Sequence, residues 1–250
     1  MAEPGETTVD GQVALVTGAS RGIGAAIAVD LARAGYTVVI NHRDSAEDAR
    51  RVAEAGGPTA TVIAADVADH AAVRRLTEEV TDRHGRLDVL VNNAGVTLPD
   101  DWRTLDPARW QRCLDVNVTG VFHCVQALAP LLEATGRGRI VNIGSTYAGM
   151  GVGAIAAYAA AKAGIAALTT AFAKELAPVV TVNLVAPGNI DTDMTRSVGE
   201  EFVAATVAQT PLRRLGTPEE IARLVRFVVS EDAAFITGQT LVCDGGHSLR

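Results

Sequence analysis

The sequence predicts one α/β domain with a doubly wound, parallel β-sheet and helices on both of its faces. Short, β-branched apolar segments alternate with longer helical segments along the chain. The apolar segments are continuous rather than alternating, which is typical of strands covered on both faces. A glycine-rich turn follows the first of them directly and opens the first helix. Regular strand–helix alternation of this kind implies right-handed crossovers and a Rossmann-like arrangement.

Seven strands and six main helices account for most of the chain. The predicted strands cover residues 13–17, 37–41, 61–65, 89–92, 139–143, 180–185 and 240–243. The predicted helices cover residues 24–34, 45–55, 71–84, 107–133, 157–176 and 218–229. Thr217 precedes a proline and two glutamates, which is the pattern of an N-cap, a first helical residue and an acidic first turn. Asp69 is expected to cap the helix that follows it.

The chain of 250 residues is treated as one domain because no repeat, linker or charge block divides it. A chain of this length buries enough surface to fold without a disulfide or a metal. We expect residues 1–10 to form a flexible, acidic arm and residues 11–250 to form the folded domain. A mostly helical segment at residues 192–210 is expected to close over the substrate as a lid.

Composition and charge restrict the possible functions. The chain is 48% hydrophobic and 20% charged, and its net charge of −7 with no dense run of Lys and Arg argues against nucleic acid as a partner. Three cysteines without a CxxC pair, and an acidic start in place of a leader, favour a cytoplasmic protein with reduced thiols. The histidines form no metal-like cluster in the sequence, so no metal is expected.

Residues 148–173 carry only one charge, Lys162, and are long enough to span a membrane. They consist largely of Ala, Gly, Thr and Tyr, and a lysine at their middle would be costly in lipid. We therefore expect no membrane span. A helix buried on most sides, in the core or at a subunit interface, fits the pattern better.

The turn after the first strand has the composition of a diphosphate-binding loop. Residues 17–24 read TGASRGIG. Glycines allow the backbone N–H groups to approach a diphosphate, and the helix N-terminus favours an anion. Tight packing alone would also favour glycine, but the position between the first strand and first helix favours a dinucleotide. The expected cofactor contacts in this turn are Gly18, Ser20, Arg21, Gly22, Ile23 and Gly24.

The end of the second strand decides between NAD and NADP in such folds. An acid there binds the ribose 2′-hydroxyl, whereas this sequence has His42 and Arg43 and no acid until Asp44. Arg43, with Arg21 in the glycine turn, offers guanidinium groups suited to a 2′-phosphate. We therefore predict NADPH as the cofactor, with His42 also at its site. The alternative is that Arg43 is an ordinary solvated arginine.

Tyr158 and Lys162 are four residues apart and therefore lie on one face of a helix. A tyrosine with a pKa near 10 is a poor acid at neutral pH, and a nearby ammonium group stabilises its phenolate. This pair alone is a weak signal. Ser145 follows one predicted strand, however, and Asn93 to Gly95 follow another. Ligands bind at the carboxyl ends of the strands in such sheets.

Together these motifs resemble the classical short-chain dehydrogenase/reductase family. The matching motifs are TGASRGIG at 17–24, NNAG at 92–95, Asn117, Ser145, Tyr158-x-x-x-Lys162 and Pro187-Gly188, in the order and spacing of that family. The segments VAPGNIDTDM at 185–194 and ITGQT at 236–240 are most similar to the 3-oxoacyl-(acyl-carrier-protein) reductase type. The resemblance implies reduction of a 3-oxoacyl thioester, or a related β-keto compound, to a secondary alcohol with NADPH.

The resemblance also implies a role for each matching residue. Tyr158 would protonate the carbonyl oxygen, Ser145 would hydrogen-bond to the same oxygen, and Lys162 would hold the nicotinamide ribose and lower the pKa of Tyr158. Asn117 would hold a water molecule of a proton relay, and it is also placed to cap a break in its helix. The other implied cofactor contacts are Asp66 and Val67 at the adenine, Asn93, Ala94 and Gly95 at the adenosine ribose, Pro187 and Gly188, and Ile190 and Thr192 at the carboxamide.

The substrate is less well defined than the chemistry. The expected pocket residues are Thr97, Leu98, Ser145, Thr146, Tyr147, Met150 and Val152, where Tyr147 is either an aromatic wall or a packed core residue. Carrier-protein reductases hold an acidic carrier with basic residues, but Glu133 stands where a base is usual. Arg103, Arg137 and Lys174 remain for that role, although a chain of net charge −7 repels an acidic carrier. An acyl carrier protein is therefore only one candidate partner.

Two other functions stay open. The first is an alcohol, sugar or sterol dehydrogenase, or a ketoreductase of a secondary-metabolite pathway, since the family runs in both directions with the same residues. The second is a non-catalytic nucleotide-binding regulator, which is disfavoured because all four catalytic positions are filled. The helix at 157–176 is small or apolar nearly all round, so we also expect a homotetramer, with the helix at 107–133 and residues 241–250 at its interfaces.

Overall fold

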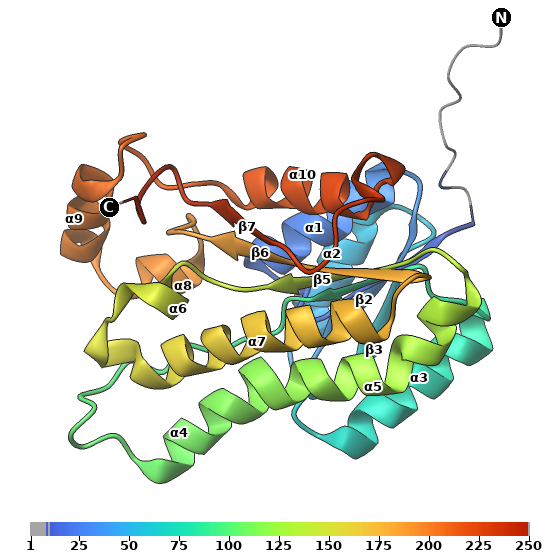
Figure 1. The fold of residues 1–250 in the computed structure, drawn as a ribbon, viewed down its shortest axis with the longest axis horizontal. Coiled ribbons are helices and arrows are strands. Elements are labelled where there is room, and N and C mark those ends of the chain that lie inside the picture. Colours follow the sequence, from blue (N-terminus) through green and yellow to red (C-terminus); the bar gives the residue numbers. More distant parts are fainter. Residues whose placement is uncertain (1–8, 10, 250) are drawn as a thin grey trace, which may run out of the picture.

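Seven strands form one parallel sheet in the order β3-β2-β1-β4-β5-β6-β7, with helices on both faces (Figure 1). This computed structural model describes residue 9 and residues 11–249, so the predicted arm at 1–10 lies outside the described residues except for Val9. The strands are β1 (Val13–Val16), β2 (Thr37–His42), β3 (Thr61–Ala64), β4 (Val89–Asn92), β5 (Gly138–Ile143), β6 (Val180–Pro187) and β7 (Thr240–Cys243). The predicted doubly wound fold and its seven strands are confirmed.

The long helices form one layer on each face of the sheet (Figure 1). One layer contains α1 (Gly22–Arg33), α2 (Ala46–Gly56) and α10 (Pro218–Val229), and the other contains α3 (His70–His84), α4 (Pro107–Leu114), α5 (Gly120–Ala134) and α7 (Ala156–Glu175). Each layer covers its own hydrophobic core. In β1, Val13 and Leu15 join the core under α3, α5 and α7, while Ala14 and Val16 join the other, because successive side chains of a strand point to opposite faces.

The predicted helix at 107–133 is interrupted at residues 115–119, which include the predicted site residue Asn117. A π-helical turn, Asp115–Thr119, separates α4 from α5, and Asn117 within it is completely buried. Its side-chain amide donates to the carbonyl oxygen of Cys113, one turn earlier, at 2.9 Å. Single π-turns inside helices are frequent at functional sites.

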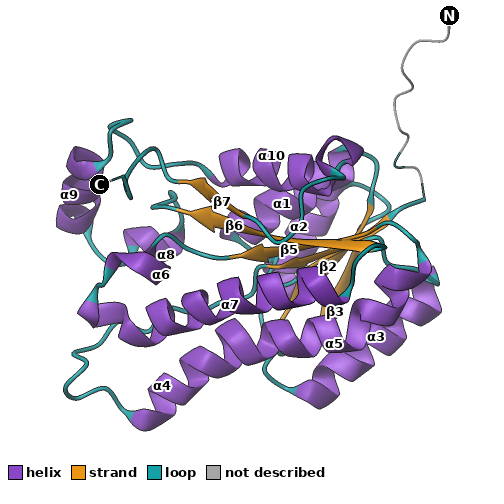
Figure 2. Cartoon of the chain, in the orientation of Figure 1, coloured by secondary structure: helices purple, strands orange, loops and turns teal. Residues whose placement is uncertain are grey.

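Short helices stand at the carboxyl ends of β5 and β6 (Figure 2). They are α6 (Tyr147–Met150), which the sequence did not indicate, and α8 (Asp193–Arg196) and α9 (Glu200–Gln209), which together occupy the predicted lid. The lid segment is thus mostly helical, as expected. Its closure is not visible in a single structure and stays a prediction.

The predicted helix caps are present. Asp69 accepts a hydrogen bond from the backbone N–H of Ala71, and Thr217 and Glu220 form a reciprocal capping box at the start of α10. The segment Gly153–Glu175 has the length and apolar composition of a membrane-spanning helix. Core helices share these properties, and α7 buries Ala157, Ala161 and Ile165. The absence of a membrane span stays a prediction.

Candidate active site

The glycine turn between β1 and α1 is pressed against the segment that follows β4. Gly18 has a φ of +60°, and a Cβ at this position would lie 2.8 Å from Ala94 Cα. A Cβ at Gly24 would lie 2.7 Å from the carbonyl oxygen of Gly18. Both positions therefore require glycine, because the turn packs closely on Asn93 and Ala94 and on its own backbone.

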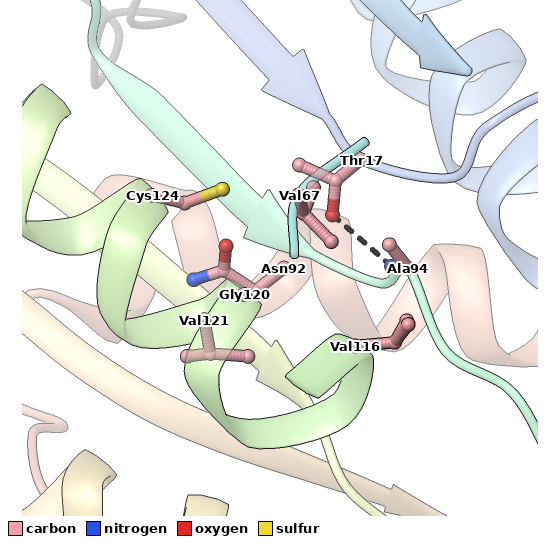
Figure 3. Close-up of a pocket in the computed structure, with 8 residues that line it drawn as sticks. All are labelled: Thr17, Val67, Asn92, Ala94, Val116, Gly120, Val121 and Cys124. Atoms are coloured by element: carbon pink, nitrogen blue, oxygen red, sulfur yellow. Dashed lines mark hydrogen bonds between the residues drawn. The ribbon is translucent and has the colours of Figure 1, made fainter. Parts of the chain in front are cut away.

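Thr17 and Asn93 hold the turn in place. Thr17 Oγ1 accepts hydrogen bonds from the backbone N–H groups of Asn93 and Ala94, each at 3.0 Å. The Asn93 amide donates to the carbonyl oxygens of Thr17 and Gly18 at 2.9 and 3.0 Å. Beside this network, Thr17, Asn92 and the first turns of α5 line a narrow space that is too small to hold a water molecule (Figure 3). Asn93 and Ala94 thus hold the glycine turn in place. This supporting role was not predicted for them.

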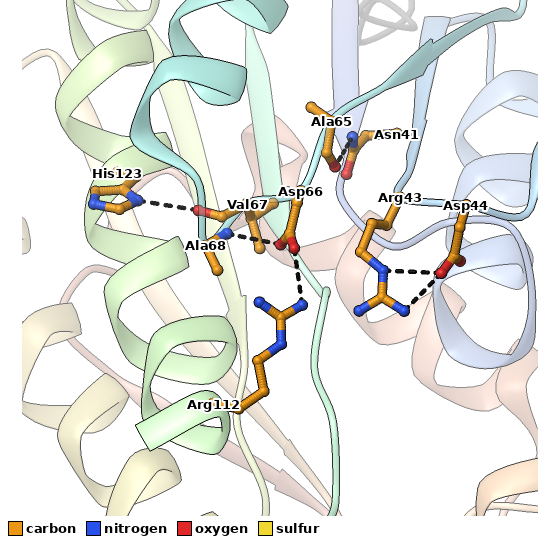
Figure 4. Close-up of polar contacts among 9 residues, drawn as sticks. All are labelled: Asn41, Arg43, Asp44, Ala65, Asp66, Val67, Ala68, Arg112 and His123. Atoms are coloured by element: carbon orange, nitrogen blue, oxygen red, sulfur yellow. Dashed lines mark hydrogen bonds and ion pairs between the residues drawn. The ribbon is translucent and has the colours of Figure 1, made fainter. Parts of the chain in front are cut away.

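Asn41, at the end of β2, is a functional residue that sequence reasoning missed. Its side-chain oxygen accepts from the N–H of Gly18 at 3.3 Å, and its amide donates to the carbonyl oxygen of Ala65 at 3.1 Å (Figure 4). Its own carbonyl oxygen accepts from Ala19 N at 2.8 Å. Asn41 therefore connects the glycine turn to the loop after β3. A polar residue at the end of an otherwise apolar strand is the signal that could have identified it.

Two ion pairs flank the predicted adenosine site (Figure 4). Arg43 donates from Nε and Nη2 to one carboxylate oxygen of Asp44, at 3.0 and 2.6 Å, and both side chains are exposed. Arg112, on α4, donates to Asp66 at 2.8 Å. Burial raises the pKa of Asp66, but hydrogen bonds from Ala68 N and Arg112 outweigh it, so the pKa lies below its usual value. Asp66 is therefore an ionised acceptor held in one orientation.

His42 and Arg43 differ in accessibility. His42 is buried, its Nδ1 has no hydrogen-bond partner in the described part of the chain, and burial lowers its pKa. Arg43 is half-exposed and faces the same space as Arg112 (Figure 4). Of the two, Arg43 has the charge and access needed at a 2′-phosphate, with Arg21 exposed at the N-cap of α1.

The residues around the glycine turn fit a dinucleotide. The turn packs so closely on Asn93 and Ala94 that positions 18 and 24 require glycine, which is the composition of a diphosphate-binding loop. It opens α1, whose N-terminus carries partial positive charge. An ionised acceptor at Asp66 and exposed guanidinium groups at Arg21 and Arg43 complete a set suited to an adenosine, a diphosphate and a 2′-phosphate.

Lys162 is buried on α7 with 4% of its surface exposed. Its ammonium group donates to the carbonyl oxygen of Ile143, at the end of β5, at 2.7 Å. Burial lowers the pKa of Lys162 to about 8. The Nζ atom lies 5.5 Å from the centre of the Tyr158 ring, so the predicted pair is assembled on one helical face.

Tyr158 does not have the lowered pKa that was expected. Burial raises the pKa of its phenol above the usual value, and the hydrogen bonds with Ser145 and Thr97 only partly offset this. The expectation failed because it counted the ammonium of Lys162 and ignored the cost of ionising a buried phenol. A neutral Tyr158 at physiological pH is a proton donor.

Asn117 and Lys162 are separated by Gly95. A Cβ at Gly95 would lie 2.7 Å from Asn117 Oδ1 and 3.6 Å from Lys162 Nζ. The Asn117 amide donates to Val96 O at 2.9 Å, and Asn117 Oδ1 accepts from Val96 N at 3.3 Å. Its side chain thus holds the loop after β4 at the helix break, which is the structural role predicted for it.

The predicted substrate residues differ in their burial and in the contacts that they make. Ser145 is buried, and its Oγ accepts a hydrogen bond from the backbone N–H of Tyr147 at 3.2 Å. Thr146 instead donates from its backbone N–H to Pro187 O at 3.1 Å, so it joins the ends of β5 and β6. Met150 is half-buried and Val152 is exposed. Thr97 contacts the lid, since its hydroxyl donates to the sulfur of Met194 at 3.4 Å.

The segment after β6 brings the remaining predicted cofactor residues beside this centre. Pro187 ends β6, and a Cβ at Gly188 would lie 2.8 Å from Asp244 Cα. Ile190 is buried and pairs with Gly216, and the Thr192 hydroxyl caps α8. Ser145 and Thr97, which follow β5 and β4, contact Tyr158, and the hydrogen bond of Tyr147 to Asn189 connects the segment after β6 to the Ser145 loop. Arg112 and Asn41, at the adenosine end, and Asn189, after β6, were not predicted as site residues.

A glycine turn at the first crossover, beside a Ser–Tyr–Lys group at the carboxyl ends of the strands, defines a nicotinamide-dependent oxidoreductase of the Rossmann type. The family model described as enoyl-(acyl carrier protein) reductase matches residues 18–248. The chain belongs to the short-chain dehydrogenase/reductase family and interconverts CH–OH and C=O groups.

Two curated relatives cover nearly the whole chain. The 3-oxoacyl-(acyl-carrier-protein) reductase FabG of Staphylococcus aureus (strain Mu50) is 43% identical over 237 residues, 93% of this chain and 96% of that protein. The 3-oxoacyl-(acyl-carrier-protein) reductase of a Synechocystis strain is 45% identical over 245 residues, 96% of this chain and 98% of that protein. Their similarity extends over both the cofactor and the catalytic segments.

Among solved structures, a gluconate 5-dehydrogenase from Burkholderia cenocepacia in complex with NADP and tartrate has a TM-score of 0.90. It is 36% identical, with 96% of each chain covered. A putative gluconate dehydrogenase from Agrobacterium tumefaciens has a TM-score of 0.92 and is 33% identical, with 97% of this chain and 98% of that chain covered. These matches confirm the fold and the family resemblance.

Proposed function

We propose that this protein is an NADPH-dependent reductase that converts the ketone of a 3-oxoacyl thioester to a secondary alcohol in the cytoplasm. The observation that carries the proposal is the placement of the Tyr158 hydroxyl beside Ser145, with the ammonium of Lys162 5.5 Å from the centre of the Tyr158 ring. A carbonyl oxygen placed between Tyr158 and Ser145 would meet one proton donor and one orienting hydroxyl.

In this reaction the Tyr158 O–H bond breaks and its proton passes to the carbonyl oxygen. Ser145 stabilises the charge that develops on that oxygen. The phenolate left on Tyr158 is stabilised by the hydroxyl groups of Ser145 and Thr97 and by the charge of Lys162. A bound nicotinamide cofactor supplies the hydride to the carbonyl carbon.

Arg43 and Arg21 support NADPH rather than NADH. Arg43 is half-exposed at the end of β2, where an acid would stand in a site for the 2′-hydroxyl. Asp44 competes for the Arg43 guanidinium in the absence of a phosphate. A phosphate with two negative charges would be the stronger partner for that guanidinium.

The thioester substrate is supported by the curated relatives, which are 3-oxoacyl-(acyl-carrier-protein) reductases 41–45% identical to this chain. Whether a carrier protein delivers it depends on surface charge. Glu133 is exposed four residues before Arg137, and Glu175 is exposed next to Lys174, so these two segments offer little net positive charge to an acidic carrier. We therefore propose that the small acyl thioester itself is sufficient as substrate.

The test is a substrate panel with NADPH that contains an acetoacetyl thioester, free and carrier-bound, simple diketones and quinones. We expect the free acetoacetyl thioester to have the highest kcat/KM among the small compounds, and at most a small gain from the carrier. Turnover of quinones alone, or of no carbonyl compound despite NADPH binding, would contradict the proposal.

A second candidate is a dehydrogenase of a hydroxy acid related to gluconate. It is favoured by the two gluconate dehydrogenase structures at 33–36% identity. The same panel with 5-ketogluconate as a further substrate separates the two candidates.

A further inference from the structure

Tyr147 and Asn189 form a polar pair beside the catalytic serine. Tyr147 begins α6 two residues after Ser145, and its backbone N–H donates to Ser145 Oγ at 3.2 Å. Asn189 follows Pro187 and Gly188 at the end of β6. The Tyr147 hydroxyl donates to Asn189 Oδ1 at 3.0 Å, which joins the two loops that border the substrate region.

The other end of the Asn189 amide is unpartnered. Its Nδ2 atom is buried and has no hydrogen-bond partner among residue 9 and residues 11–249. Tyr147 already occupies the oxygen, so the free function is an N–H donor. A buried donor without a partner is costly and calls for an explanation, most simply a ligand that accepts its hydrogen bond.

The position of the pair suggests which ligand this is. Tyr147 is close enough to Tyr158 to influence the pKa of its phenol. Three residues beyond Asn189, the chain reaches Thr192, the N-cap of α8, where the lid segment begins. The donor therefore lies between the oxygen-binding residues and the lid, where the part of the substrate next to the reacting ketone must pass.

We propose that Asn189 is a specificity-determining residue whose amide donates to a second oxygen of the substrate, one carbon removed from the reacting carbonyl. In a 3-oxoacyl compound this acceptor is the thioester or ester carbonyl oxygen. Tyr147 is the positioning residue, because it holds Asn189 Oδ1 and thereby aims Nδ2. The inference rests on the proposed function, since it names how that site recognises a β-keto substrate.

This arrangement selects for substrates with a second carbonyl group. The amide donor of Asn189 stays unpaired when a substrate lacks that second oxygen. Sites built to hydrogen-bond a substrate group reject analogues without that group more strongly than apolar pockets reject a changed methylene. Ethyl 3-oxobutanoate and 2-heptanone are a matched pair for this test, because they have the same backbone length and differ in the ester group.

The experiment measures kcat/KM with NADPH for both compounds in the parent, in Asn189→Asp and Asn189→Leu, and in Tyr147→Phe. Both Asn189 variants should lose about tenfold or more on the ester and change little on the ketone. Tyr147→Phe keeps the ring and should lose roughly three- to tenfold on the ester alone. The double variant Tyr147→Phe, Asn189→Leu should be no worse than Asn189→Leu, because Tyr147 acts through Asn189.

NADPH affinity and thermal midpoint, measured on each variant, show whether the fold and the cofactor site are intact. Asn189→Asp is nearly isosteric with the parent side chain and also removes the amide donor. It therefore tests the same role if Asn189→Leu does not fold. An equal loss on both compounds, or no loss on either, would overturn the role of Asn189 while the proposed ketoreductase stands. A parent enzyme that reduces 2-heptanone but not the ester would overturn both.

Discussion

The ammonium group of Lys162 donates a hydrogen bond to the carbonyl oxygen of Ile143 at 2.7 Å. This bond ties the middle of α7 to the carboxyl end of β5, two residues before Ser145. It therefore fixes the helix of Tyr158 against the strand that leads to Ser145, the serine that we propose as catalytic. The same burial that makes this contact rigid also lowers the pKa of Lys162 to about 8.

Ketone reduction should therefore weaken above a pH of about 8. The protonated lysine stabilises the Tyr158 phenolate, and this stabilisation is lost as the pH rises through the pKa of Lys162. The profile of kcat/KM against pH, with NADPH affinity measured at each pH, tests this. A profile that stays flat to a pH of about 10 would show that Lys162 keeps an ordinary pKa.

Tyr158→Phe should lower kcat by about two to four powers of ten, because it removes the proton donor and little volume. NADPH should still bind with nearly the parent affinity, as the ring continues to fill its place. Single-turnover reduction and fluorescence titration of NADPH measure the two effects separately. If the variant retained substantial ketone reduction, another group would have to be the acid.

Arg43→Asp should reverse the cofactor preference from NADPH to NADH. The new carboxylate repels a 2′-phosphate and offers an acceptor to a 2′-hydroxyl. The measurement is the ratio of kcat/KM for the two cofactors. Arg51→Asp is the matched control, since Arg51 is exposed on α2 and pairs only with its helical neighbours Glu47 and Asp48. A parent enzyme with equal kcat/KM for both cofactors would refute the prediction.

Glu220→Gln should destabilise the protein by about 1 kcal/mol at neutral pH. Glu220 accepts from Thr217 N at 2.8 Å and from Arg214 at 2.6 and 2.7 Å, and these contacts lower its pKa to about 2. Since the folded pKa lies below the unfolded one, the contribution is present above the unfolded pKa and is lost as the pH falls toward 2.

Urea unfolding of Glu220→Gln and of the parent, repeated at falling pH, should therefore show a difference that shrinks in acid. Glu219→Gln is the control, because Glu219 is exposed and adjacent in the same helical turn. A difference that is constant with pH would mean that the carboxylate charge is not what stabilises this cap.

The protein should sediment as a homotetramer. Phe122 on α5 is 41% exposed and stacks on Phe172 of α7, so these two helices share an uncovered apolar surface. Three further exposed apolar side chains, Phe235, Val242 and Leu249, belong to β7 and to the segments on either side of it. Analytical ultracentrifugation at micromolar concentration is the measurement. A mass near the 26.0 kDa of one chain would refute the tetramer. A stable dimer would show that only one of the two proposed interfaces forms.

The strand and helix pattern was largely predictable because it depends on short-range periodicity. The continuous apolar runs became seven buried strands, and the caps at Asp69 and Thr217 formed as their local sequence indicated. The predicted helix at 107–133 was wrong in one respect, since the π-turn at Asp115–Thr119 depends on bonds from Asn117 to Val96. That partner is distant in sequence, so no local pattern contains it.

By itself, the sequence determined the glycine turn and the order in which strands and helices follow one another, and it suggested the four positions that we propose as catalytic. Only the tertiary structure decided the pKa values and the partners of these groups. Tyr158 and Lys162 are both shifted by burial, while Asn41, Arg112 and Asn189 act through residues on other strands and loops. The physical reason is that desolvation and hydrogen bonding depend on what the folded chain brings within a few ångströms, whereas secondary structure depends mainly on near neighbours in sequence.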